Sequence, residues 1–315
     1  MNQQKRPKVT IGLPVFNGEK YIKNALDAAL SQSFTDFELI ISDNGSTDST
    51  PLICNDYAKR DKRIFYFRHE KNNGGIWNFL FVLEKANCEY FTWLSADDIW
   101  YEKYLEKNLQ ILESDKKIVG CASKFEVFGA NYEYLKHVDG ESTIKASYKK
   151  LRRHFRNFRY FSIKGDYEKK IRSCFSQQFF GLLVYSIFRT EKLRESVKLM
   201  QHEHGAWERQ TILSIIKFGD IHVIDEILWK RYDSGISTKS NPLVSFIKNE
   251  IGFKQLFIPK FSYTVWCWNH LGKKNFLRNL DYFIKINLVG PLIILLAFGR
   301  LINKFKKKTL DHQNR

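Results

Sequence analysis

Cysteine is scarce in this sequence, and its spacing excludes two classes of protein. Five cysteines are scattered through 315 residues, at an odd total and without a C-x-x-C pair: Cys54, Cys88, Cys121, Cys174 and Cys267. A disulfide framework needs an even number of closely spaced cysteines, and a structural zinc site needs paired ligands. We therefore expect neither, and the pattern is typical of a reducing compartment.

Two glycine-rich phosphate-binding motifs and a signal peptide are also missing. No G-x-G-x-x-G follows the first predicted strand, which counts against a dinucleotide fold, and no G-x-x-x-x-G-K-[ST] occurs, which excludes a P-loop nucleotidase. Residues 1–10 lack the apolar stretch of a signal peptide. We expect a cytoplasmic protein, unless the C-terminal region attaches it to a membrane.

Acidic residues are too few to balance the basic ones. Lys and Arg total 51 against 34 Asp and Glu, a net charge of +17, so the partners are expected to be anionic: nucleotides, phosphorylated substrates, acidic lipids or nucleic acid. A hydrophobic content of 43% indicates a folded chain. The length allows one large domain, or one and a half.

Strand and helix patterns alternate four times in the first hundred or so residues. Strands are predicted over 9–13, 38–42, 64–68 and 90–94, and each is followed by a segment with apolar residues at helical spacing, as at Ile22, Ala25, Leu26 and Ala29. This alternation predicts an α/β protein with a doubly wound parallel sheet.

The alternation weakens after residue 122. There we expect a buried strand over 179–188, a helix over 207–217 that stops at Gly219, and a strand over 221–228.

Two adjacent carboxylates follow the fourth predicted strand. Residues 90–94 read YFTWL, and Asp97 and Asp98 come two residues later. Side by side they repel each other, and burial is costly for each unless a cation neutralises them, so a site for Mg²⁺ or Mn²⁺ and a diphosphate is the simplest explanation. Asp43 ends the second strand and should share this edge, where ligands bind in open α/β sheets. The alternatives are a solvated loop at 97–98 and a turn residue at 43.

Several motifs in order resemble one known family. The segments PVFNGEKYIKNALDAALSQSFTDFELIISDNGSTDST, NNGG and EYFTWLSADD are similar to the nucleotide-sugar-binding half of family 2 glycosyltransferases, which have the GT-A fold. The resemblance is dense over residues 8–122 and looser to 232. It implies a GT-A domain over 1–232, whose second half, 123–232, binds the acceptor. Residues 233–315 are expected to form a helical C-terminal region.

The resemblance implies roles for residues of the first two loops. Pro14, Phe16 and Asn17 match the family's first nucleotide-contacting loop, and Glu19 lies beside them. Asp43 matches the acid that recognises the nucleobase.

It also implies a metal site. Asp97 and Asp98 match the D-x-D-type carboxylates; Asp98 is expected to bind Mg²⁺ or Mn²⁺ directly, and Asp97 to contact the ribose or assist the metal. Ser95 stands where many relatives have Asp, which bears on the strength of metal binding.

The family's catalytic base is expected near residue 208. In relatives a helix opens with Glu-Asp, and this Asp deprotonates the acceptor hydroxyl. Counting back from Gly219, its place is taken by Glu208, and Trp207 replaces the preceding Glu. A Glu can act as the base if it reaches the acceptor oxygen, although a Glu at a helix start often only interacts with the helix dipole. Three rival candidates precede it: His202, Glu203 and His204.

The implied reaction is sugar transfer with inversion from a UDP- or GDP-linked sugar to an acceptor glycan or lipid-linked sugar, in the assembly of cell-surface glycan or glycolipid. No Q-x-x-R-W run is present, so a single-sugar transferase is expected instead of a processive synthase. Two alternatives remain: a catalytically inactive homologue that binds a nucleotide sugar or nucleic acid, and a nucleotidyltransferase.

Two segments could contact a membrane. Residues 145–172 hold eleven Lys or Arg interleaved with aromatics. They form either a solvated basic face or an element that faces acidic lipids. A nucleic-acid site is a third alternative, and it is weaker because the sequence contains no known nucleic-acid-binding module. We expect no nucleic acid partner. Residues 288–298 are apolar and too short to span a bilayer, and lysines follow. Residues 286–308 therefore form either a core helix or an in-plane anchor on the inner, anionic face of the membrane.

Overall fold

The structure is a computed structural model that describes residues 6–129, 160–177, 179–200, 206–232 and 260–287. The chain divides into two compact units, Met1–Gly235 and Ile236–Arg315, and each is described by itself.

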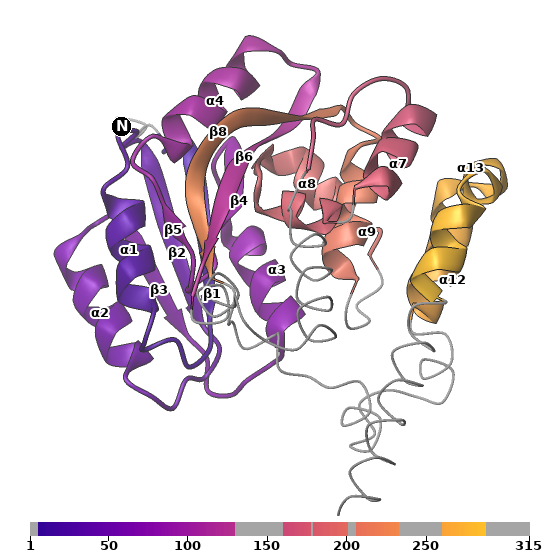
Figure 1. The fold of residues 1–315 in the computed structure, drawn as a ribbon. Coiled ribbons are helices and arrows are strands. Elements are labelled where there is room, and N and C mark those ends of the chain that lie inside the picture. The colour runs from indigo at the N-terminus through magenta and orange to yellow at the C-terminus, as the bar shows by residue number, and fades with distance from the viewer. Residues whose placement is uncertain (1–5, 130–159, 178, 201–205, 233–259, 288–315) are drawn as a thin grey trace, which may run out of the picture. The chain divides into compact units, whose positions relative to one another are not determined.

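The first unit is built on one sheet, which has eight strands among the described residues, in the order β3-β2-β1-β4-β7-β6-β8-β5 (Figure 1). The strands are β1 Val9–Val15, β2 Phe37–Asp43, β3 Ile64–Arg68, β4 Tyr90–Trp93, β5 Ile99–Trp100, β6 Ile118–Phe128, β7 Ile187–Arg189 and β8 Asp220–Tyr232. Strands β1 to β4 are mutually parallel, as are β6 and β8. Strand β7 is antiparallel to β4 and β6, and β5 to β8.

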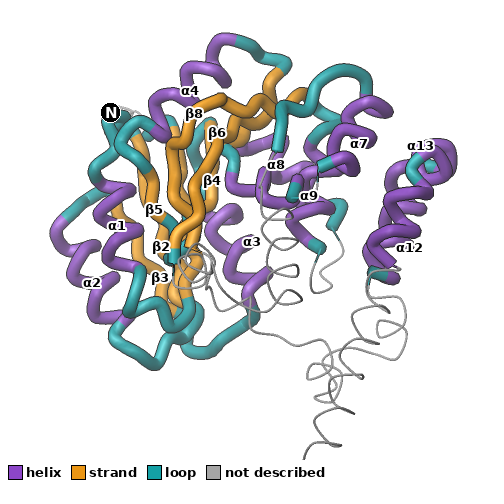
Figure 2. The backbone as a smooth tube through the Cα atoms, in the orientation of Figure 1, coloured by secondary structure: helices purple, strands orange, loops and turns teal. Residues whose placement is uncertain are grey.

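Helices cover both faces of this sheet (Figure 2). They are α1 Ile22–Leu30, α2 Thr50–Arg60, α3 Gly75–Lys85, α4 Tyr104–Ser114, α7 Tyr167–Ser176, the 3₁₀ helix η1 Phe180–Tyr185, α8 Thr190–Val197 and α9 Trp207–Ile215. Figure 1 shows α1 and α2 on one face and α3 on the other. The predicted doubly wound, mostly parallel sheet is confirmed, and the periodic residues of α1 are buried as expected.

Strand β1 is the centre of the core and reaches further than predicted. It is buried along its whole length and continues to Val15, so that Pro14 lies inside the strand and not in the loop. The Gly12 carbonyl accepts from Leu94 on the β4 side, and the Val15 carbonyl accepts from Asn44 on the β2 side. Because alternate residues face opposite neighbours, Pro14 faces the β4 side, beyond the last β4 partner of β1 at Gly12. Its missing N–H therefore breaks no ladder hydrogen bond.

The strand predicted over 179–188 is wrong for most of its length. Residues 180–185 form η1, and only Ile187–Arg189 form a strand. Phe180, Leu183 and Val184 are buried, and a short apolar run has the same appearance in a buried strand and in a buried helical turn. Strands β5 and β6 were not predicted either.

Helix α9 ends earlier than predicted, at Ile215. Gly219 lies beyond it and serves a different purpose from a helix stop: a Cβ at this position would overlap the carbonyl oxygen of Lys117. Only glycine allows this close approach of the two backbones.

The basic segment 145–172 lies largely outside the described residues, but one of its lysines has a definite place. Lys170 in α7 is buried, and its Nζ donates to the carbonyls of Ile216 (3.3 Å) and Gly219 (2.8 Å) and pairs with Asp220 at 2.8 Å. The expectation of a solvated or lipid-facing side chain is therefore wrong for Lys170, which satisfies the carbonyls that follow α9.

The second unit contains α12 Phe261–Leu271 and α13 Lys273–Arg278. The chain returns beside the start of α12: the Asn287 amide oxygen accepts from the Lys260 N–H, and its NH₂ group donates to the Thr264 hydroxyl. The predicted helical C-terminal region is present. In the ranges described, no helix is both long and apolar enough to cross a membrane. Most of the predicted anchor, 286–308, lies outside those ranges.

Replacing Lys170 by Met should lower the free energy of unfolding by about 1–3 kcal/mol, because two carbonyls and a carboxylate lose a charged donor. Urea unfolding followed by circular dichroism measures the change. Lys169→Met is the matched control: that side chain is 78% exposed, and its loss should cost no more than about 0.5 kcal/mol. Equal losses for the two variants would contradict the role given to Lys170.

Candidate active site

Three loops meet at the carboxyl edge of the parallel strands. Strands β1, β2 and β4 end at Val15, Asp43 and Trp93, and in the register of β1 with β2, Val15 pairs with Asp43. A Cβ on Gly18 would lie 3.8 Å from the Cβ of Ala96, so the loop after β1 touches the loop that carries the two carboxylates. Asp43, Asp97 and Asp98 therefore share one edge, as the parallel arrangement predicted.

The loops after β1 and β2 are joined by reciprocal hydrogen bonds. Asn17 has a left-handed backbone (φ 51°); its N–H donates to the Ser46 hydroxyl and its side-chain oxygen accepts from the Thr47 N–H, both at 2.9 Å. The Glu19 carboxylate accepts from the Ser49 N–H at 3.0 Å. Asn17 and Glu19 are thus occupied in holding the second loop. Phe16, the residue after β1, is 37% exposed and remains available to a ligand.

Asp43 is fully buried and has a partner on each carboxylate oxygen. Oδ1 accepts from the Ser46 N–H and Oδ2 from the Tyr66 hydroxyl, both at 2.8 Å. Burial raises the pKa of Tyr66, and the hydrogen bond to Asp43 raises it further, so this tyrosine donates as a neutral phenol. Each carboxylate oxygen keeps a second lone pair. Because none of the Asp43 side chain is exposed, a ligand reaches these oxygens only when neighbouring groups move aside.

Asp98 is the most deeply buried of the predicted metal ligands, with 3% of its surface exposed. Its N–H donates to the Ser95 carbonyl, and its Oδ1 accepts from the Tyr232 N–H, both at 3.1 Å. Burial raises the pKa of the Asp98 carboxyl well above its usual range, and the charge of Asp97 raises it further, whereas Arg231 acts in the opposite direction. Burial likewise raises the pKa of Asp97.

This carboxylate pair suits a divalent cation that a diphosphate helps to bind. Among the described residues no group of three or more His, Cys, Asp or Glu is placed to hold a metal. Mg²⁺ is commonly held by one or two carboxylates together with substrate phosphates and water. One buried and one half-buried carboxylate, with Arg231 close enough to lower the pKa of both, fit that arrangement.

The end of β8 closes over the pair. The Tyr232 ring lies 4.7 Å from the Tyr21 ring, and their hydroxyls are 3.1 Å apart. Asp97 is close enough to Tyr21 to contribute to the raised pKa of that phenol, whose main cause is the Tyr232 hydrogen bond. Tyr232 therefore connects the carboxylates to the segment that follows the first loop.

Glu208 lies in the first turn of α9, and tryptophan packing fixes where that turn lies. The Trp207 ring is 5.6 Å from Trp93, the last residue of β4, and 4.9 Å from Phe79 of α3. A Cβ on Gly181 would be 3.6 Å from the Cβ of Glu208, so η1 lies against the same turn. The Trp at position 207 thus brings the start of α9 to the end of β4.

The pKa of one tyrosine, Tyr185, is raised by burial and by both Asp98 and Glu208. Burial raises the pKa of Tyr185, a hydrogen bond with Ser95 lowers it, and the charges of Asp98 and Glu208 each raise it. Glu208 and Asp98 therefore both lie close enough to the Tyr185 phenol to raise its pKa. The rival bases His202, Glu203 and His204 lie outside the described residues.

Sequence reasoning missed Arg231, Tyr232, Tyr21 and Tyr185. Arg231 and Tyr232 come from a strand that pairs with β6, more than a hundred residues away, and nothing local marks them. Tyr21 stood within the quoted first motif, and its aromatic ring beside a polar loop was the one available signal.

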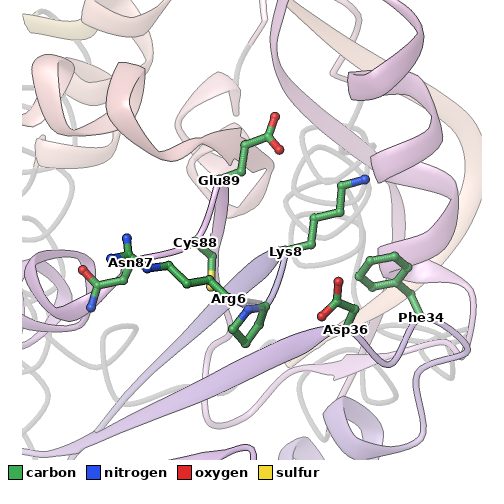
Figure 3. A pocket seen from close by; sticks show the side chains of 8 residues that line it. Arg6, Lys8, Phe34, Asp36, Asn87, Cys88 and Glu89 are labelled. Carbon is green, nitrogen blue, oxygen red and sulfur yellow. The ribbon is translucent and has the colours of Figure 1, made fainter. Parts of the chain in front are cut away.

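A pocket of about 420 Å³ opens at the opposite edge of the sheet, where β1 and β4 begin (Figure 3). Its lining includes Arg6, Lys8, Phe34, Asp36, Cys88 and Glu89. Lys8 is paired with Glu113 at 2.5 Å, and burial raises the pKa of the Cys88 thiol to about 12. A mixed lining without a reactive group makes this pocket a poor candidate for the chemistry.

The sequence profile of one family decides the assignment. The profile described as "Glycosyl transferase family 2" matches residues 10–192, more than half of the chain. The chain belongs to glycosyl transferase family 2. The resemblance predicted from the first loops and the carboxylates is thereby confirmed.

Curated relatives of this family 2 protein are glycosyltransferases by name. An uncharacterized glycosyltransferase of Rickettsia typhi is 38% identical over 119 residues, which make up 36% of this chain and 36% of that protein. A Bacillus subtilis protein named for teichuronic acid biosynthesis, TuaG, is 36% identical over 107 residues, 34% of this chain and 42% of TuaG. The match covers well under half of the length of either relative.

Solved structures share the fold. TarS of Staphylococcus aureus, residues 1–349 in complex with UDP-GlcNAc, has a TM-score of 0.55 at 18% identity, over 74% of this chain and 61% of that one. The mannosyltransferase PcManGT of Pyrobaculum calidifontis, in complex with GDP-Man and Mn²⁺, has a TM-score of 0.50 at 16% identity, over 72% and 57%. The predicted GT-A fold of the family 2 chain is confirmed.

Asp98→Asn should raise the thermal midpoint of the metal-free protein by roughly 2–5 °C, because it removes the buried one of two adjacent like charges and keeps the oxygen that accepts from Tyr232. Differential scanning fluorimetry with and without Mn²⁺ tests this. Mn²⁺ should stabilise the wild type more than the variant. A variant that is less stable without metal would show that the carboxylate pair is not under electrostatic strain.

Proposed function

We propose that this family 2 protein is an inverting glycosyltransferase that moves a sugar from a nucleoside-diphosphate sugar to an acceptor hydroxyl. The observation that carries the proposal is the pair of half-buried Asp97 and buried Asp98, at the edge of the sheet where Asp43 also lies, with Glu208 close enough to act on the same tyrosine as Asp98. TarS with UDP-GlcNAc and PcManGT with GDP-Man and Mn²⁺ share this fold, which supports a UDP- or GDP-linked donor and a divalent cation, Mg²⁺ or Mn²⁺.

The donor would lie across the three joined loops. Asp43 accepts a hydrogen bond from the nucleobase, and Phe16, beside Pro14 and the Asn17–Glu19 loop, contacts the nucleoside. Asp97 contacts the ribose or assists the metal, and Asp98 is the direct metal ligand. Because reciprocal hydrogen bonds fix the first two loops, the nucleotide meets a site that is formed before it binds.

The acceptor hydroxyl would be activated by Glu208. Its carboxylate takes the proton from the hydroxyl, whose oxygen attacks the anomeric carbon from the side opposite the leaving group, so the configuration inverts and a nucleoside diphosphate departs. Asp98 would hold a divalent cation, which would supply positive charge to stabilise the leaving diphosphate. Arg231 adds a fixed positive charge near the same carboxylates.

The acceptor is proposed to be a glycan or a lipid-linked sugar of the cell surface, reached from the inner face of the membrane. The name of TuaG, which refers to teichuronic acid biosynthesis, supports polysaccharide assembly, and the complex of TarS with UDP-GlcNAc supports a UDP-linked sugar donor for it. The net charge of +17 supports contact with an anionic membrane surface.

The direct test is incubation with Mn²⁺ and a panel of UDP- and GDP-sugars, with the released nucleotide measured by chromatography. We expect slow release of UDP or GDP from one donor, and Asp98→Ala should abolish it; Asp56→Ala, on the exposed face of α2, is the control and should retain it. Pyrophosphate as product would identify a nucleotidyltransferase. Donor binding without any release would identify an inactive binding homologue, the reading that Ser95 and the change at 208 leave open.

The assignment of the base has its own test. Glu208→Gln keeps the size of the side chain and removes the base, so transfer to acceptor should fall by about 10²–10⁴-fold while the affinity for the nucleoside diphosphate, measured by calorimetry, stays unchanged. Glu191→Gln on α8, with a 77% exposed side chain, is the matched control and should transfer normally. Full activity of Glu208→Gln would assign the base to another residue.

A further inference from the structure

The second unit carries an apolar stripe on its surface. Leu277, near the end of α13, is 58% exposed, and Leu280 and Ile284, one helical turn apart in the helical residues that follow the turn at Asn279, are 44% and 49% exposed. Phe276 and Phe283, which neighbour these residues, are buried and stack at 4.2 Å. The segment therefore has buried aromatic side chains and, beside them, exposed apolar ones.

Basic side chains accompany this apolar stripe. Residues 273–285 contain Lys273, Lys274, Arg278 and Lys285 against a single acid, Asp281, and all five are exposed. Trp268 of α12 is also 38% exposed, and its ring packs on Phe276 at 5.1 Å. An exposed Trp beside leucines, with lysines around them, is the composition of a helix that lies in the headgroup region of a bilayer.

We propose that the segment 273–285 binds the surface of a bilayer rich in anionic phospholipid, with the apolar stripe in the acyl boundary and the basic side chains on the headgroups. The charge ratio of four to one favours this occupant over a neutral protein surface. The segment lies before the predicted anchor 286–308, so it is a separate contact. The purpose of this membrane contact rests on the proposed function: it would bring the enzyme to a lipid-linked acceptor.

Binding of the full chain to vesicles tests the inference. Vesicles of phosphatidylcholine with about 30% phosphatidylglycerol should sediment the wild type at low salt, and pure phosphatidylcholine vesicles should not. Replacing the apolar stripe by Leu277→Gln, Leu280→Gln and Ile284→Gln should lower the partition coefficient about tenfold or more. Leu52→Gln, at a 75% exposed position on α2, is the matched control and should bind like the wild type.

A second variant separates charge from apolar contact. Lys273→Gln with Lys285→Gln should reduce the preference for phosphatidylglycerol by about threefold or more while leaving the fold intact by circular dichroism. The inference would be overturned by equal binding to both vesicle types or by unchanged binding of the triple variant. It would also be overturned if the wild type bound no vesicles but formed a dimer that the triple variant could not form. Nucleoside diphosphate release is measured on the same samples. Vesicle binding without release would support this inference and refute the proposed enzyme activity. Release without vesicle binding would support the enzyme activity and refute this inference.

Discussion

The structure of the first unit depends on one costly arrangement: two adjacent carboxylates, one of them almost fully buried, at the end of a strand in the middle of the sheet. Asp98 is tolerated there because the Tyr232 N–H donates to it and Arg231 supplies a positive charge. Both come from the end of β8, which reaches this place by pairing with β6 and β5. The mixed half of the sheet, with β7, β6, β8 and β5, therefore completes a site that the parallel half begins, and neither half forms it alone.

Aromatic packing brings the acid of α9 to the same edge. Trp207, at the position where the resemblance predicts an acid, packs edge-on against Trp93 at the end of β4. Burying two indoles at this contact supplies apolar area that an acid could not, and it fixes the first turn of α9 next to η1. The longer side chain of Glu208, in place of Asp, then extends from a helix start whose position is set by its neighbour.

The parallel half of the fold could be predicted from the sequence, because each of its strands and helices carries its own periodic pattern; only details such as the length of β1 around Pro14 were wrong. The edge shared by Asp43, Asp97 and Asp98 followed from parallel pairing alone. The contacts of Tyr232, Arg231 and Lys170 could not be predicted, since they arise from pairings between segments distant in sequence. The apolar run of η1 lacked a period that distinguishes a strand from a helical turn, which explains that error. Roles for Glu208 and the first loop remain predictions.

The hydrogen bonds that join the first two loops have a consequence for how such a protein can diverge. Asn17 and Glu19 hold Ser46, Thr47 and Ser49, so each loop provides the template for the other. A substitution in one loop alone leaves a hydrogen-bond donor or acceptor of the other loop without its partner. A new preference for a sugar donor would therefore require both loops to change together, whether it arises in evolution or is built into a chimera. The effect of a change in one loop would depend on the sequence of the other.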